Sequence, residues 1–373
     1  MSRASIFDQL HRRQSIADAP EPASSVRSDY DTETLRLIDG VALTPAGFVG
    51  RGSVPDADTP ALSETLYGSD GYRLLVHAVG DVMPLSEPRL SRLEVKAARL
   101  HELVETILIE ALMLLEGIPE ESAFDVVLEL PLRSADAASF ILERVRDAIK
   151  ETQFGEWLSD IRHQSPLGDP HAATAVGTGG GMDYVLWISA DSLLTQEGVT
   201  SLARRGLLAQ SSRGAGLYPG EAVAALLMER LLPERDNPEE GWLLARGLAE
   251  THGARAGRRD HDKRQALQGV LERLWPEADA ASAPSGLVVD SMGLKGRAVE
   301  LGGAIIERWP ELDAIDDGVA VDGFCGWPGD ALVPLMLVLA IAPLALEESA
   351  VVLGIGSETE TLAWAVSGTT GHS

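Results

Sequence analysis

The sequence predicts a layered α/β fold built from two similar halves, and three observations support this prediction. Stretches with strand-like alternation and stretches with helix-like spacing follow one another along the chain. The segment 183–189 (DYVLWIS) is apolar on both faces, as is usual for the central strands of parallel sheets. The same order of strands and helices returns after a polar middle segment. Because 45% of the 373 residues are hydrophobic, the chain can bury a substantial core.

Regular patterns in the first half begin near Leu35 and follow the order β-α-β-α. Residues 72–79 alternate in polarity, which predicts a strand. Apolar side chains then recur every three or four positions from residue 91 to residue 116, which predicts a long helix that Gly117 and Pro119 end. The remaining predicted elements of this half are a strand at 125–130, a helix at 135–150, the strand at 183–189, a helix at 198–205 and a strand at 222–229.

The chain divides into four predicted regions: a mobile tail at 1–30, a first half at 31–230, a polar insertion or linker at 231–284, and a second half at 285–373. The middle region is rich in Arg, Asp, Glu, Gly and Pro and contains one helical stretch, at 264–274. In the second half we expect strands at 287–290, 319–322, 350–354 and 361–366, and helices at 297–308 and 330–339.

Composition excludes several classes of function. A formal net charge of −26 repels phosphate backbones and anionic lipid headgroups, so we expect neither nucleic acid nor a membrane as a partner. The one cysteine, Cys325, cannot form an internal disulfide, and the polar N-terminus lacks the apolar segment of a secretory signal, so we expect a cytoplasmic protein. The longest apolar run, 331–346, is short for a membrane span and contains Pro334 and Pro343, which indicates a buried helix.

Several motifs resemble those of the β-ketoacyl synthases. In that family a strand ending in Gly-Gly-Val-Asp is followed by a helix, a Gly-Met-Leu-Ser loop and a Pro-Gly-Glu turn. The corresponding parts here are Ser189-Ala190-Asp191, Arg205-Gly206-Leu207-Leu208 and Pro219-Gly220-Glu221.

The second half resembles the same family in three further places. The stretch 323–331, with Gly326 and Trp327, resembles the Asn-Ile-Gly-His loop, and 351–356, with Gly354 and Gly356, resembles the closing Phe-Gly-Phe-Gly-Gly turn. The stretch 287–293 stands where the family has Glu-Ala-His-Gly-Thr-Gly-Thr. The resemblance covers about 70–230 and 285–367. It implies a five-layered α-β-α-β-α thiolase-like fold with two pseudo-equivalent halves, usually paired as a homodimer.

The resemblance also shows which catalytic groups are missing. Decarboxylative condensation in the family requires a cysteine thiolate and two histidines that converge on one point. The segment 165–174, which precedes the strand at 183–189, contains no cysteine, Ser291 or Met292 replaces the first histidine, and Trp327 replaces the second. We therefore expect no catalytic residue of the condensing type, no cofactor and no metal.

Weaker candidates for a nucleophile remain. Cys325 is a candidate relocated nucleophile, although the simpler interpretation is a buried thiol behind its loop. Ser165, Thr174 and Thr178 are candidate hydroxyl nucleophiles, with His163 or His171 as a base and the glycines at 177–181 as an oxyanion pocket; a turn that replaces a lost helix explains the same residues.

Two other clusters allow alternative interpretations. Asp169, His163 and His171 are residue types that bind metals. The simpler interpretation is that their grouping is a coincidence, because one short loop supplies a single carboxylate and two spaced imidazoles. A basic cluster in the middle region indicates either a solvated insertion or a docking patch for an acidic partner, and its members are Arg255, Arg258, Arg259, Lys263 and Arg264.

The resemblance implies a function in protein assembly. Small degenerate ketosynthase-like proteins occur beside bacterial type VI secretion effectors and their adaptors, and this chain looks like one of them. The hypothesis is an inactive adaptor or co-chaperone whose partner is a secreted effector or its adaptor, present as a homodimer or as a heterodimer with a thiolase-like protein. The alternatives are an acyltransferase or 3-oxoacyl synthase of altered mechanism, and the inactive partner subunit of a heterodimeric synthase.

Overall fold

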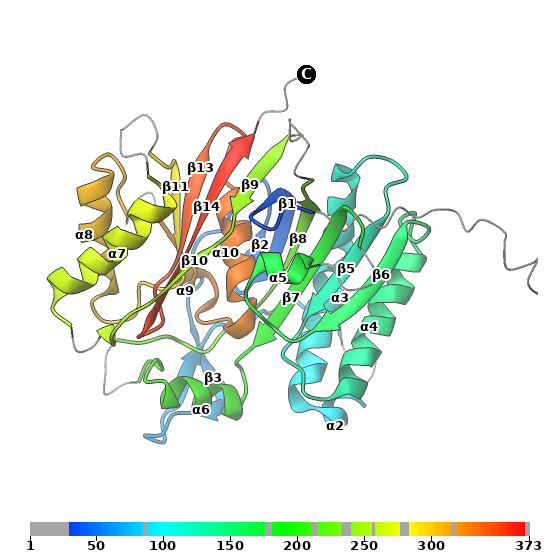
Figure 1. Cartoon of the computed structure of the whole chain (residues 1–373). Helices are drawn as coiled ribbons and strands as arrows, with labels where there is room; N and C mark the ends of the chain where they lie inside the picture. The colour runs from blue at the N-terminus through cyan, green and yellow to red at the C-terminus, as the bar shows by residue number, and fades with distance from the viewer. Residues whose placement is uncertain are drawn as a thin grey trace, which may run out of the picture.

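One mixed β-sheet runs through the body of the molecule, with helices on its outer faces and between its two parts (Figure 1). The computed structural model describes residues 30–84, 89–175, 181–210, 215–232, 240–255, 258–276, 283–314 and 318–369. The expected tail at 1–30 therefore lies outside the described residues except for its last residue. Within the described part, the strand order is β12-β11-β13-β14-β9-β1-β8-β7-β5-β6, with β2 beside β1 and β10 beside β14.

The strands of this sheet are β1 (Thr34–Thr44), β2 (Gly47–Val49), β5 (Phe124–Glu129), β6 (Leu158–Gln164), β7 (Tyr184–Ser192), β8 (Glu221–Arg230), β9 (Gly241–Ala245), β10 (Leu248–Thr251), β11 (Gly286–Val289), β12 (Gly318–Ala320), β13 (Ser349–Gly354) and β14 (Glu360–Thr369). A separate ribbon consists of β3 (Ala61–Tyr67) and β4 (Arg73–Val76).

The helices are α2 (Leu90–Leu93), α3 (Val95–Met113), η1 (Leu114–Gly117), α4 (Ala135–Lys150), α5 (Pro170–Thr174), α6 (Gln196–Arg204), α7 (Asp260–Leu274), α8 (Arg297–Arg308), α9 (Asp322–Cys325), η4 (Gly329–Ala331) and α10 (Leu332–Ile341). The helices predicted at 135–150 and 297–308 are confirmed with the same bounds. In α4 the Ser134 hydroxyl accepts a hydrogen bond from the Ala137 N–H, which fixes the first turn.

The two halves of the sheet repeat one pattern. In the order β6-β5-β7-β8-β1, three parallel strands are followed by two antiparallel pairings, and the order β12-β11-β13-β14-β9 repeats this arrangement. Strands β1 and β9 pair with each other and join the halves. The prediction of two pseudo-equivalent halves in an α/β fold is therefore confirmed.

Three apolar clusters separate the layers. Along β7, Leu186 and Ile188 pack against α3 and α4 on one face, whereas Val185 and Trp187 face the cluster around α10 on the other. A third cluster joins α7 and α8 to the outer face of β11 and β13. The layer order is therefore α3 and α4, the first sheet half, α10, the second sheet half, α7 and α8, which gives the five predicted layers (Figure 1).

The apolar run predicted to be a buried helix forms α10, which is buried between the sheet halves. In the part of the chain that the structure describes, no helix is both long and apolar enough to cross a membrane. The counterpart of α10 in the first half is α5. In the sequence, α5 lies between β6 and β7, as α10 lies between β12 and β13. With five residues against ten, α5 is a shortened version of that central helix.

The middle region requires a correction. The segment 231–284 was expected to be a polar insertion or linker, but it supplies β9, β10 and α7. Strand β9 is antiparallel to both β1 and β14, and its Trp242 and Leu244 are fully buried. This segment therefore contains the first strand of the second half, so that half begins near residue 241 instead of residue 285.

Candidate functional site

Loops from both halves meet at the junction between them, and the motif positions of the two halves come into direct contact there. Pro219 forms a parallel bridge with Trp327, the Gly220 N–H donates to the Trp327 carbonyl at 3.1 Å, and the Trp327 N–H donates to the Tyr218 carbonyl at 2.8 Å. A Cβ on Gly220 would lie 1.6 Å from the Cys325 carbonyl oxygen, so only glycine permits this approach. The Pro-Gly-Glu turn and the Gly326–Trp327 loop therefore form one structural unit.

Trp327 fills the junction. Its side chain is 5% exposed and belongs to an apolar cluster with residues of the β3–β4 ribbon and of α6. A Cβ on Gly356 would lie 2.9 Å from Trp327 Cη2 and 2.9 Å from Asp290 Oδ2. The indole ring is thus packed beside the closing turn and next to a buried carboxyl group, and it occupies volume that a ligand would otherwise need.

Asp290 is a site residue that the motif comparison did not single out. Its Oδ1 accepts from the Ile355 N–H at 3.0 Å and its Oδ2 from the Gly356 N–H at 2.7 Å. Burial raises the pKa of Asp290 to about 6 and the charge of Asp322 acts in the same direction, while the two backbone N–H groups oppose the shift. The carboxyl group holds the loop after β11 against the closing turn after β13.

Ser291 and Met292, the two positions expected to replace the first histidine, are bound to Asp322. The Ser291 hydroxyl donates to Asp322 Oδ2 at 2.9 Å, and the backbone N–H groups of Met292 and Gly293 donate to the same carboxylate at 3.1 and 2.7 Å. Hydrogen bonds to Asp322 therefore hold this loop in place, and the Ser291 hydroxyl already donates to that carboxylate.

Asp191 and Glu221 act as structural clamps. Asp191 forms an ion pair with Lys96 and accepts from the Asp330 N–H at 2.7 Å, which ties β7 to the start of α10. The fully buried Glu221 accepts from Arg99 at 2.6 Å, and its other interactions are with the Ser192 hydroxyl at 2.7 Å and the Val79 N–H at 2.9 Å.

Sequence reasoning also missed His77, which the structure brings to the same junction. His77 Nδ1 lies 2.7 Å from Asp58 Oδ2, and a Cβ on Gly326 would be 2.8 Å from His77 Cδ2. The side chain of His77 is 3% exposed. No motif could have revealed it, because its contacts come from chain segments far apart in the sequence. An imidazole oriented by a carboxylate is a possible proton acceptor.

Cys325 lies behind the Gly326 loop. Its thiol is fully buried, and Sγ has long contacts with the carbonyls of Val321 and Gly326 at 3.6 and 3.7 Å. Burial raises the pKa of the Cys325 thiol well above its usual value, and the charges of Asp322 and Asp58 raise it further. The thiol is therefore neutral at ordinary pH, which disfavours nucleophilic attack.

Among the described candidates within 163–174, the Thr174 hydroxyl and the His163 imidazole are engaged in separate contacts. Ser165 is exposed, whereas the buried Thr174 hydroxyl donates to the carbonyls of Pro170 and His171 at 3.1 Å. His163 Nε2 contacts the Leu130 carbonyl at 3.0 Å. Thr178 and the glycines at 177–180 lie outside the described residues.

The position of the shortened helix is held by a buried carboxyl group. Glu129 accepts from the Trp187 indole N–H at 2.6 Å and from the Gly168 N–H at 3.2 Å. Burial raises the pKa of Glu129, and these hydrogen bonds counteract the shift. Asp169 caps α5 by accepting from the His171 N–H at 3.0 Å. Among the described residues, no group of His, Cys, Asp and Glu could hold a metal ion.

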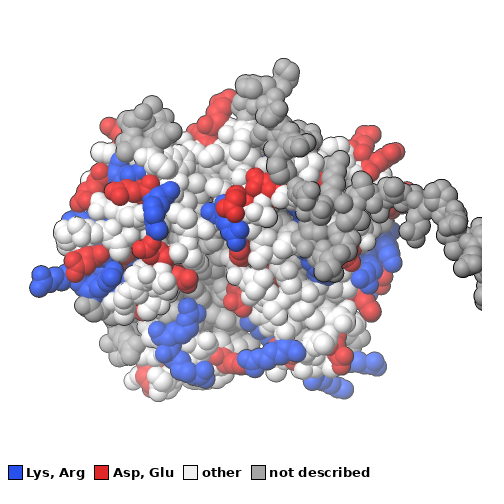
Figure 2. All heavy atoms as spheres, in the orientation of Figure 1, with Lys and Arg blue, Asp and Glu red and all other residues white. Residues whose placement is uncertain are grey.

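Three of the five members of the basic cluster form ion pairs within the molecule. Arg255 is 2% exposed and its Nε donates to Glu300 at 3.0 Å, so its interpretation as solvated is wrong. Arg264 pairs with Glu307 at 3.2 Å and Lys263 with Asp260 at 3.2 Å. On the face shown in Figure 2, acidic and basic residues are interspersed.

Comparison with solved structures identifies the fold. No family model and no curated protein matches the sequence. AbyA1, a tetronic acid condensing enzyme, is similar over 90% of this chain and 100% of its own, with a TM-score of 0.51 and 14% identity. The chain has the thiolase-like fold. A histidine-to-asparagine variant of OleA from Xanthomonas campestris with cerulenin is similar over 92% of this chain and 98% of its own, with a TM-score of 0.49 and 12% identity. The 3-oxoacyl-(acyl carrier protein) synthase III of Xanthomonas oryzae pv. oryzae is similar over 91% and 99%, with a TM-score of 0.47 and 15% identity.

Proposed function

We propose that this thiolase-like protein does not catalyse acyl condensation and acts by binding other proteins. The observation that carries the proposal is the packing of Trp327 at the junction, beside Gly356 and Asp290. The single thiol of the chain, Cys325, is fully buried with a raised pKa, and Ser291 is hydrogen-bonded to Asp322. The indole ring occupies volume at the junction that a substrate acyl chain would need.

The proposed role is that of an adaptor or co-chaperone in the cytoplasm, with a secreted effector of a type VI system or the effector's own adaptor as the partner. Pairing into a homodimer, or a heterodimer with another thiolase-like protein, belongs to the same proposal. The motif resemblance supports it, because recognisable loops are kept while Cys-His-His is absent from the matching positions.

The test is acylation of the full-length protein. Purified protein is incubated with acyl-CoA and with acyl-carrier thioesters, and the intact mass is measured. We expect no stable adduct. An adduct on the wild-type protein that disappears in Cys325→Ala would refute the proposal. Purification of the tagged chain from its own cell then identifies the partner: a secreted toxin supports the adaptor role, whereas a thiolase-like subunit with an intact cysteine supports the role of inactive synthase subunit.

One observation favours a second candidate, an acyltransferase or 3-oxoacyl synthase of altered mechanism. The His77–Asp58 pair lies against Gly326, next to the residue that carries the thiol. If this pair served as a base, His77→Gln would abolish an acyl adduct that the wild-type protein forms, while leaving the folded structure intact. An unchanged adduct in His77→Gln would exclude that mechanism.

A further inference from the structure

A gap in the strand pairing of β1 forms the floor of a cavity. On one side, β1 pairs with β8 from Leu35 to Leu43. On the other side it pairs with β9 at Thr34–Leu37 and with β2 at Ala42–Thr44. Among the described residues, no strand pairs with positions 38–41 on that side, which is a gap of about 13 Å at the usual rise of an extended chain.

The backbone at this gap has an irregular register. The pairing with β8 shifts between Leu37 and Asp39, as in a β-bulge, and such bulges redirect side chains at sheet edges. The Gly40 N–H donates to the Asp39 carboxylate at 2.7 Å, so a neighbouring side chain replaces the missing strand partner. Within the described part of the chain, the backbone groups of the gap therefore have no strand partner, and an added strand would displace this contact.

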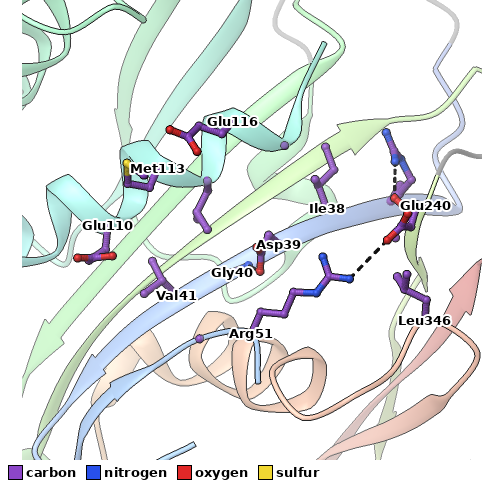
Figure 3. A pocket seen from close by; sticks show the side chains of 15 residues that line it. Ile38, Asp39, Gly40, Val41, Arg51, Glu110, Met113, Glu116, Glu240 and Leu346 are labelled. Carbon is purple, nitrogen blue, oxygen red and sulfur yellow. Dashed lines mark hydrogen bonds and ion pairs between the residues drawn. The ribbon is translucent and has the colours of Figure 1, made fainter. Parts of the chain in front are cut away.

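The cavity against the gap has a volume of about 630 Å³, within the usual range of ligand sites. Ile38, Val41, Met113 and Leu346 supply apolar walls. In Figure 3, side chains from α3 and η1 lie on one side of β1, and the side chain of Arg51 extends on the other side toward Glu240.

The cavity carries an excess of negative charge. Arg36 is already bound to Glu229 at 2.5 Å and to the Glu240 carbonyl at 2.7 Å, and Arg51 pairs with the Glu240 carboxylate at 3.5 Å. In the described part of the chain, three further carboxylates of the lining have no ion pair within 4 Å: Asp39, Glu110 and Glu116. Burial raises the pKa of Asp39, while the hydrogen bond from the Gly40 N–H and the charge of Arg51 oppose the shift.

We propose that this cavity binds an extended peptide segment of a partner protein, which adds a short strand beside residues 38–41 and places a lysine or arginine side chain between Asp39, Glu110 and Glu116. Among the described residues this backbone edge has no strand partner, which favours an extended peptide as the ligand, and the carboxylates without an ion pair favour a basic one. The exposed Arg51–Glu240 pair contributes little stability and can open to admit the segment.

This site deepens the proposed function, since it supplies a surface for a protein partner, and it rests on that function only for the existence of such a partner. The two proposals fail separately. Peptide binding together with an acyl adduct on Cys325 would refute the non-catalytic role and keep the site, whereas a missing adduct without peptide binding would do the reverse.

The probe is a fluorescein-labelled peptide, Ser-Thr-Val-Arg-Val-Thr-Ser, titrated with the full-length protein while anisotropy is measured. Three competitors separate the contributions: the same peptide with Glu in place of Arg, the peptide with alternate backbone nitrogens methylated, and spermidine. We expect saturable binding that weakens with salt. The Glu peptide and the methylated peptide should each compete at least about tenfold more weakly than the parent peptide.

Matched variants locate the site. Asp39→Asn and Glu116→Gln should each weaken binding about three- to tenfold, because each removes one charge-assisted contact. Glu64→Gln, on the exposed surface of β3, should leave binding unchanged. Thermal unfolding of each variant shows that the fold is kept. Absence of saturable binding up to about 1 mM protein, equal affinity in all variants, or equal competition by spermidine or the methylated peptide would overturn the proposal.

Discussion

Asp290 should make the stability of the protein depend on pH in a defined direction. Its pKa is about 6 in the folded protein, against an ordinary value of 3.8 that applies to the unfolded chain. Below pH 3.8 the carboxyl group is protonated in both the folded and the unfolded state, so its ionisation does not lower the free energy of unfolding. As the pH rises, the unfolded chain ionises first, so the contribution of Asp290 to stability is lost between about pH 4 and pH 6. The separation of the two values corresponds to a loss of about 3 kcal/mol.

Denaturant unfolding of the wild-type protein and of Asp290→Asn between pH 4 and pH 8 measures this contribution. The variant cannot ionise, so the difference in unfolding free energy between variant and wild type should shift in favour of the variant by about 3 kcal/mol as the pH rises to 7. Any loss of the hydrogen bonds from Ile355 or Gly356 adds a constant offset that does not change with pH. Asp81→Asn, at an exposed position, serves as the control. A difference that stays constant over the whole range would refute the reasoning.

Three further predictions concern the junction. Gly220→Ala should prevent the native packing, because its Cβ would lie 1.6 Å from the Cys325 carbonyl oxygen; gel filtration measures the yield of folded protein. The matched control is Gly302→Ala, in the middle of α8, where a Cβ would have no atom within 4 Å. This control should stabilise the protein by about 0.5–1 kcal/mol. Trp327→Ala should destabilise by about 3–5 kcal/mol in chemical unfolding, and a loss below about 1 kcal/mol would mean that the indole is not part of the core. Iodoacetamide should label Cys325 only after denaturation, and rapid labelling of the native protein would contradict its burial.

Local sequence signals were sufficient for the longer elements. Helices α4 and α8 have clear apolar faces and were predicted with their observed bounds. The short strand β9 could not be recognised, because its five residues lie within a polar segment and are stabilised by pairing with β1 and β14, which are distant in sequence. Strand β1 contains Asp39-Gly40, a pair typical of turns, and is nevertheless extended because β8 pairs along it.

For the site, the sequence identified the loops but not their interactions. The positions of Trp327 and Gly220 followed from motifs, and the structure places them in contact. Asp290 lies within the matched stretch 287–293 but corresponds to no catalytic position of the motif, and His77 lies outside the motifs; the environments of both depend on burial and on partners from other elements, such as Gly356 and Asp58. Such environments are properties of the tertiary structure and leave no periodic or spacing signal in one sequence.

The position of β1 also constrains how the protein can be made. This strand leaves the ribosome before its long-range partners β8 and β9, which are encoded almost two hundred residues later; only the short strand β2 follows it directly. At synthesis rates of about 5–20 residues per second, most of β1 waits roughly ten to forty seconds without these two partners. Its apolar residues are then open to wrong pairing between nascent chains, so overproduction at lower temperature or with a holding chaperone should raise the soluble yield. Truncation after β8 would leave the edge of β1 that faces β9 without that partner. We expect such a fragment to aggregate instead of folding as half a molecule.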